Sequence, residues 1–313
     1  MQTSLRARLS GRADLLMILC AAMLWGTVGV TTRTLYETSA ANPLSVGFFR
    51  LAIATPALLI ACWLTLGRRA WRVAPRDLGL MVLIGAMLAL YQVCYFFAIA
   101  RVGVAVATLV TLCTAPVIVA LLGTALGRER MTRTLALVLA LALGGTALLI
   151  DLRAILARPA DLLGIGLALG SALGYAVVTL VGRSLGGRYP SIQTTAISFA
   201  SGALVLLPLA LATGFVAHYA ADGWLRLLYL GLIPSALAYA LFFRGVRGVS
   251  ATATTILTLI EPLTATALAW LLFHERLGAS GAIGAALLLG AVLLLGLRGE
   301  DERREQSGAP ERT

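Results

Sequence analysis

Long apolar stretches recur along almost the whole chain, and they restrict its fold more than any other feature of the sequence. Stretches of about 18 or more apolar residues are long enough to cross the hydrocarbon core of a bilayer as helices. Hydrophobic residues make up 59% of the chain, above the roughly 45–50% of a soluble domain. Because the stretches are continuous, and not short segments of alternating polarity, they favour helices over a transmembrane barrel. The sequence therefore predicts an all-α polytopic membrane protein.

Ten transmembrane helices can be drawn from these stretches. They are expected at residues 15–32, 43–66, 78–100, 104–126, 134–152, 162–181, 191–212, 224–243, 250–273 and 279–297. Several connections are only a few residues long, so consecutive helices are expected to be antiparallel neighbours. Four aspartates stand just before a predicted span, where a carboxylate can cap the free amides of a helix start. They are Asp14, Asp77, Asp161 and Asp222.

The basic residues, all of them arginine, indicate how the chain is oriented. A net charge of +11 would suggest a nucleic-acid partner for a soluble protein. Here the arginines stand in short loops between spans, so topology explains them and no nucleic acid is expected. With ten spans the two termini share one side of the membrane, and most of the loop arginines lie on that side. By the positive-inside rule, both termini are expected to face the cytoplasm, in the inner (plasma) membrane.

Two stretches of the chain, residues 108–130 and 254–276, resemble each other at one constant offset. The matching landmarks are Pro116 with Pro262, Glu129 with Glu275, Arg130 with Arg276 and, upstream, Arg101 with Arg247. The alternative is that Leu- and Ala-rich helices resemble each other by composition alone. Coincident landmarks at a single spacing argue against that alternative and in favour of an internal repeat.

The repeat predicts how the chain is divided. A cytoplasmic arm at 1–13 precedes a first five-helix half at 14–152, and a loop at 153–160 leads to a second five-helix half at 161–297. Residues 298–313 form a charged cytoplasmic tail that is expected to be disordered. Because five is an odd number, the two halves must lie in the membrane with opposite orientations. Inverted repeats of this kind are typical of transporters that hold a solute near the midplane, in a central cavity between the halves.

At this point the chain resembles the EamA-like members of the drug/metabolite transporter superfamily, over about residues 15–297. The resemblance rests on Leu24-Trp25-Gly26, on Phe49-Arg50, and on Pro116 and Pro262 with the sequences Leu126-Gly127-Arg128-Glu129-Arg130 and Leu272-Phe273-His274-Glu275-Arg276 that follow them. It implies a basket of ten helices around a cavity. Known members mostly export amino acids and other small metabolites, and others import sugars or carry nucleotide sugars. Phe273 departs from the family pattern, which is expected to affect loop packing only.

Glu261 is a carboxylate inside an apolar span, at the place where the earlier copy has Ala115. An ionisable group there costs roughly 2.5–3.5 kcal/mol on insertion scales, so it should face a cavity or a partner. Thr254, Thr258 and Glu261 share one helical face. Pro262 has no N–H, so it leaves the Thr258 carbonyl without its usual donor. This face is predicted to bind an ammonium group or a coupling proton; the alternative is a glutamate that pairs with Arg50 or a tyrosine and locks helices together.

Arg50 is the other charge inside a predicted span. Its guanidinium either meets a substrate carboxylate or binds backbone carbonyls near a helix end. Six further residues, mostly aromatic rings with polar tips, are candidates for the wall of a cavity, with packing as the alternative for each. They are Trp25, Tyr91, Gln92, Tyr95, Tyr175 and Tyr239.

The sequence therefore predicts a secondary transporter that exports a small organic metabolite, such as an amino acid, by alternating access. A passive facilitator, a drug exporter and a membrane scaffold without transport are the alternatives. No His-Glu-x-x-His, Gly-x-Ser-x-Gly or pair of intramembrane acids occurs, so no enzyme activity, cofactor or metal is predicted. The expected partners are a small-molecule solute and the lipid bilayer. Small residues at Gly144–Gly145, Gly284 and Gly290 could support a homodimer.

Overall fold

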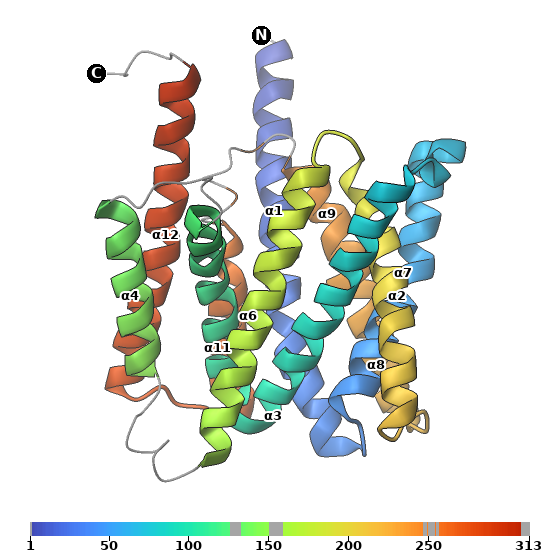
Figure 1. Cartoon of the computed structure of the whole chain (residues 1–313), viewed down its shortest axis with the longest axis vertical. Helices are drawn as coiled ribbons and strands as arrows, with labels where there is room; N and C mark the ends of the chain where they lie inside the picture. The colour runs from blue at the N-terminus through green and yellow to red at the C-terminus, as the bar shows by residue number, and fades with distance from the viewer. Residues whose placement is uncertain are drawn as a thin grey trace.

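The computed structural model describes residues 2–125, 133–149, 159–246, 249, 254 and 257–307, and this part of the chain is helical throughout, apart from connections (Figure 1). Its elements are α1 (Gln2–Thr38), α2 (Pro43–Leu66), η1 (Gly67–Trp71), α3 (Pro75–Ala125), α4 (Arg133–Leu149), α6 (Pro159–Leu185), α7 (Ser191–Ala212), α8 (Ala221–Gly231), η2 (Leu232–Leu237), α9 (Ala238–Gly245), α11 (Ile260–Phe273) and α12 (Ala279–Ser307). Six helices within these described ranges are long and apolar enough to cross a membrane. The predicted all-α class is confirmed, while the count of ten transmembrane helices stays a prediction.

The two ends of the helix bundle differ. The chain begins α1 and finishes α12 at the same end of the bundle (Figure 1), called the terminal end below, and the other is called the opposite end. Two expectations about these helices are wrong. Asp14 caps no helix start, because α1 already begins at Gln2. The tail after residue 297 is not disordered as far as Ser307, because α12 continues to that residue.

Asp77 and Asp222 do lie in the first turns of α3 and α8, respectively. The Asp77 carboxylate also accepts hydrogen bonds from Arg188 Nη1 at 2.8 Å and Tyr189 Oη at 2.9 Å, so it ties α3 to the connection between α6 and α7. Asp222 pairs with Arg226 at 3.6 Å, an exposed contact of small energetic value. The expectation for Asp161 lies outside the side chains that the structure describes.

Helix α3 covers two predicted spans, because the backbone is interrupted at Gly103 rather than by a loop. Gly103 has φ 80° and ψ 173°, a region that is essentially open to glycine alone. The two arms of α3 contact each other across this break: the hydroxyls of Tyr95 and Thr108 lie 2.7 Å apart. One glycine therefore replaces the whole connection between two spans.

Elements α8, η2 and α9 follow one another directly, and η2 is a π-helical turn. Pro234 lies in this turn and has no N–H to donate to the carbonyl of Leu230. The hydroxyl of Ser235 donates to that carbonyl instead, at 2.8 Å. A proline thus widens the helix locally, as π-turns at functional sites often do, and directs Ser235 into the bundle, where it is fully buried.

Helices α3 and α7 cross in close contact at Gly85. A Cβ atom built there would lie 2.8 Å from Gly202 N and would overlap the Ser201 hydroxyl and the Ser198 carbonyl. We therefore expect Gly85→Leu to lower the free energy of unfolding by more than the roughly 1–3 kcal/mol of ordinary overpacking, because backbone atoms cannot move aside. Thermal unfolding in detergent measures the effect. Gly79→Leu on the same helix, where no atom lies within 4 Å, is the control; equal unfolding of both variants would contradict the prediction.

Helix α4 packs against α12 (Figure 1). At this contact a Cβ on Gly145 would lie 2.8 Å from the carbonyl oxygen of Gly284. Part of the small-residue face predicted for a homodimer is therefore used within one subunit. Gly144 and Gly290 have no atom within 4 Å of a Cβ position, and a homodimer contact there stays a prediction.

Candidate functional site

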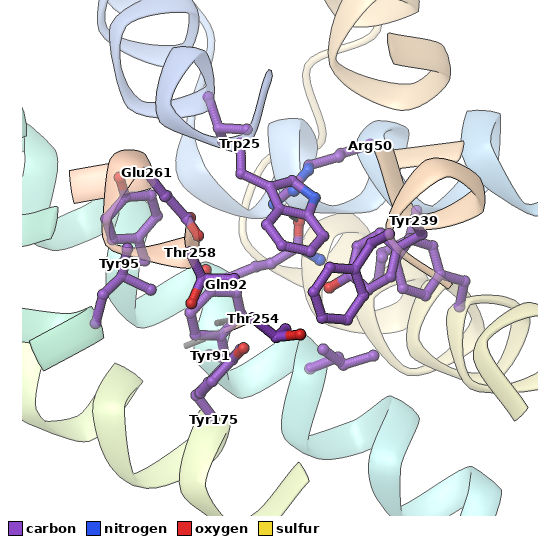
Figure 2. A pocket seen from close by; sticks show the side chains of 16 residues that line it. Trp25, Arg50, Tyr91, Gln92, Tyr95, Tyr175, Tyr239, Thr254, Thr258 and Glu261 are labelled. Atoms are coloured by element: carbon purple, nitrogen blue, oxygen red, sulfur yellow. Dashed lines mark hydrogen bonds between the residues drawn. The ribbon is translucent and has the colours of Figure 1, made fainter. Parts of the chain in front are cut away.

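A cavity of about 290 Å³ lies among the helices, and all ten residues predicted as solute-binding line it (Figure 2). They come from α1, α2, α3, α6, α9, α11 and the residues just before α11. Solute binding by these residues stays a prediction. The lining residues that the sequence did not single out are Val28, Leu51, Leu88, Leu112, Phe199 and Phe242. Phe199 and Phe242 carry the same signal as the tyrosines, an aromatic ring inside a span.

Arg50 is buried at the wall of this cavity and is held by two side chains. Its Nε donates to the Ser235 hydroxyl at 2.9 Å, and its Nη1 donates to Gln92 Oε1 at 3.0 Å. These partners are side chains of η2 and α3, and not the backbone carbonyls considered from the sequence. Ser235 was missed, although its place beside Pro234 in an apolar span was the available signal.

Glu261 lies in the first turn of α11. Figure 2 shows its carboxylate beside Thr258 at the cavity. None of the ion pairs between described residues joins Glu261 to Arg50, so a direct lock between these two charges is not what the structure shows. The cavity instead has a buried positive side chain from α2 and a partly buried negative side chain from α11 on its wall.

Gly26 explains why α1 comes so close to Glu261. A Cβ on Gly26 would lie 2.8 Å from the Glu261 carbonyl oxygen and 2.7 Å from Thr264 Cβ. The absence of a side chain at this position therefore brings α1 against the start of α11. Trp25, the preceding residue, lines the cavity (Figure 2).

Aromatic rings form much of the wall. Tyr91 and Tyr95 stack with their planes 3° apart, Tyr91 also contacts Tyr175 at 5.5 Å between ring centroids, and Trp25 contacts Tyr239 at 5.1 Å. The Tyr95 hydroxyl is already bonded to Thr108. Tyr95 therefore contributes mainly its aromatic ring, and not its hydroxyl, to the cavity wall.

A second cavity, of about 430 Å³, adjoins the first one. The two share Leu88, Phe199, Tyr239 and Phe242. The second cavity extends to the end of α6 and the start of α7, where Arg183 and Ser191 line it. These residues belong to the terminal end of the bundle, so the space inside the protein continues from the first cavity in that direction.

The opposite end is held together around Glu275. Its carboxylate accepts hydrogen bonds from the backbone N–H groups of Val104 and Ala105, both at 3.0 Å, and pairs with Arg33 Nη1. Glu275 thus caps the second arm of α3, and not its own helix. The Arg33 guanidinium also lies 4.2 Å from the centre of the Phe273 ring. Phe273, the residue that departs from the family pattern, thus makes a cation–π contact with Arg33. The corresponding Glu129 and Arg130 lie outside the described residues.

Charged side chains that face a cavity among apolar helices mark the solute and ion pathways of membrane transporters. Two segments of the chain, residues 13–151 and 162–297, match the family model described as the EamA-like transporter family. The chain belongs to this family. The resemblance seen in the sequence is thereby confirmed.

Several curated relatives are named as transporters. "Uncharacterized transporter YwfM" of Bacillus subtilis (strain 168) is 34% identical over 280 residues, which are 90% of this chain and 92% of that protein. An "Uncharacterized transporter" of Archaeoglobus fulgidus is 34% identical over 272 residues, 87% and 92% of the two chains. "Uncharacterized inner membrane transporter YicL" of Salmonella typhimurium is 27% identical over 273 residues, 84% and 88%. Transport across a membrane is the function that the family and these names support.

A protein of known crystal structure has the same fold. It is 21% identical to this chain, with a TM-score of 0.64, and the match covers 92% of this chain and 98% of that one. At this level of identity the likeness concerns the fold alone.

Proposed function

We propose that this protein is a secondary transporter of the inner membrane that exports a small organic metabolite, such as an amino acid, by alternating access. The observation that carries the proposal is the pair of opposite charges, the buried Arg50 and the partly buried Glu261, on the wall of one cavity. Charged side chains are costly inside a membrane and are retained there mainly where they serve a solute or ion. Membership of a transporter family supports the same role.

The proposed architecture is ten transmembrane helices in two inverted halves, residues 14–152 and 161–297. One family model matches the chain twice, in succession, which supports two related halves. The break of α3 at Gly103, which divides a 51-residue helix, supports counting that helix as two spans. Most arginines of the loops lie on the side of the termini, which supports cytoplasmic termini.

Alternating access requires that the cavity open to one side at a time. The second cavity continues the first toward the terminal end, whereas Glu275, Arg33 and the second arm of α3 are joined at the opposite end. With cytoplasmic termini, this is a state that receives solute from the cytoplasm. Opening to the outside would require the contacts around Glu275 to separate while the terminal end closes.

Export is tested first by a metabolite profile. We expect the medium of cells that overexpress the protein to contain more of at least one small metabolite than the medium of cells that lack it. That metabolite then serves as the solute for transport by the purified protein in liposomes. If no metabolite differs, and none moves in liposomes, the proposal gives way to a scaffold without transport.

Glu261→Gln is expected to slow transport in liposomes by at least about tenfold, because a charge-assisted hydrogen bond to the solute or a coupling proton is lost. If Glu261 carries a coupling proton, the variant also loses the response of solute flux to an imposed proton gradient. Asp222→Asn, an exposed acidic position on α8, is the control. Unchanged flux and unchanged pH dependence in Glu261→Gln would remove Glu261 from the mechanism. A wild-type flux that ignores the gradient would identify a passive facilitator.

A further inference from the structure

The hydrogen bonds of Arg50 determine how Gln92 is oriented. The guanidinium is always protonated and only donates. Gln92 must therefore present its carbonyl oxygen to Arg50 Nη1, at 3.0 Å, and its amide nitrogen Nε2 is left at the other side of the group. Ser235, which donates to Leu230 O, can likewise only accept from Arg50 Nε. Two of the three guanidinium nitrogens are thereby committed.

Three kinds of hydrogen-bond donor, from Trp25, Arg50 and Gln92, line the same cavity. Gln92 Nε2 and Trp25 Nε1 are both buried and have no hydrogen-bond partner among the described residues. Arg50 keeps further N–H groups on its Nη atoms, beyond its bonds to Ser235 and Gln92. A buried donor without a partner needs an explanation, and a ligand acceptor is one. All these donors line the same cavity, and together they suit a carboxylate.

Glu261 gives the other part of the wall the opposite character. Its carboxylate, when ionised, only accepts hydrogen bonds. In Figure 2, Glu261 and Arg50 lie on different sides of the Trp25 ring, and no ion pair joins these two described residues. A cation that reached Glu261 would be a donor, as an ammonium group is. The cavity therefore has a donor end and an acceptor end.

Resting on the proposed function, we propose that the solute is an amino acid held by both of its charged groups at once. Its carboxylate binds at Trp25, Arg50 and Gln92, and its ammonium group binds at Glu261. A zwitterion compensates both charges on the cavity wall and adds no net charge, whereas a simple anion or cation leaves one of them uncompensated. The stacked rings of Tyr91 and Tyr95 provide an apolar wall for the solute's side chain.

Binding to the purified protein in lipid nanodiscs tests this assignment. Thermal unfolding is measured with each common protein amino acid, because a ligand that binds the folded state raises the unfolding temperature. The best amino acid is then compared, by calorimetric titration, with its amide, which lacks the carboxylate, and with its deamino acid, which lacks the ammonium group. We expect each of these two analogues to bind at least about tenfold more weakly.

Three variants assign the two ends. Glu261→Gln should weaken binding of the amino acid but not of the deamino acid. The ratio of these two affinities should therefore fall about tenfold or more. Trp25→Phe and Gln92→Leu should instead lower the ratio of the affinity for the amino acid to the affinity for its amide. Trp270→Phe, an exposed position on α11, should change neither preference. Because each preference is a ratio measured on the folded protein, partial loss of folded material does not alter it.

Failure of this proposal is distinguishable from failure of the proposed function. If no amino acid binds while the metabolite profile and liposomes reveal another solute, the proposed transport function is kept and the proposal of a zwitterionic solute is overturned. Equal binding of the amino acid, amide and deamino acid, or preferences that the variants leave unchanged, also overturns it. If nothing is transported and nothing binds, both proposals fall.

Discussion

Arg50→Met is expected to abolish transport and to destabilise the protein at the same time. The Arg50 side chain is only 7% exposed and donates to Ser235 and Gln92, which are also buried. Methionine would leave both acceptors without this donor, at a cost of about 1–3 kcal/mol each. It would also leave the Glu261 carboxylate without the positive charge on the same cavity wall. Transport in liposomes and thermal unfolding in detergent measure the two effects.

Two further variants separate the charge of Arg50 from its geometry. Arg50→Lys keeps the charge, but an ammonium group lacks the planar fork that reaches both acceptors, so transport should fall markedly with a smaller loss of stability. Ser235→Ala leaves the arginine in place and removes one of its two partners, and its effect should be the smallest. Full transport by Arg50→Met would exclude Arg50 from the site and leave it a structural residue.

Gly103→Ala is expected to loosen the opposite end of the bundle. At φ 80° a side chain is strained, which costs about 1–3 kcal/mol. The new Cβ would also lie 2.6 Å from Glu275 Oε1, so the carboxylate that caps the second arm of α3 must move. Loss of a cap adds about 0.5–2 kcal/mol. The loss of stability in thermal unfolding should equal the sum of the strain and the lost cap. If this end closes the transport path, solute should also cross the membrane of liposomes faster through the variant.

Gly187→Ala is the matched control for this prediction. Gly187 has φ 79°, close to that of Gly103, but no atom lies within 4 Å of its Cβ position. Its substitution therefore measures backbone strain without displacement of a cap. Glu275→Gln supplies the reverse case, in which the cap loses its charge and the backbone is unstrained. Equal destabilisation by Gly103→Ala and Gly187→Ala would mean that the cap contributes nothing measurable.

Local patterns predicted the helical class and the candidate residues. The apolar stretches located the helices, and a gap of three residues between two predicted spans marked the break that the structure places at Gly103. The helical face of Thr254, Thr258 and Glu261 also follows from spacing within one segment, and all three line the cavity. Membership of the EamA-like family followed from short motifs.

Predictions that depended on distant partners were less successful. Glu275 stood out in the sequence only as a landmark of the repeat, yet its carboxylate caps a helix arm about 170 residues earlier in the chain. Asp14 was expected to start a helix, but local composition did not reveal that α1 begins at Gln2. Ser235 was missed because its importance depends on Arg50, which comes from another helix.

The sequence by itself determined that the chain forms apolar helices, which of their residues are ionisable, and to which family it belongs. These properties follow from transfer free energies and from hydrogen bonds within a helix, and both depend on residues that are neighbours in the chain. Only the tertiary structure decided that Arg50 bonds to Ser235 and Gln92 rather than to Glu261. Which side chains meet depends on how helices pack, and positions such as Gly26 set that approach through contacts between distant segments. The two ends of the cavity therefore became visible only once the helices were placed together.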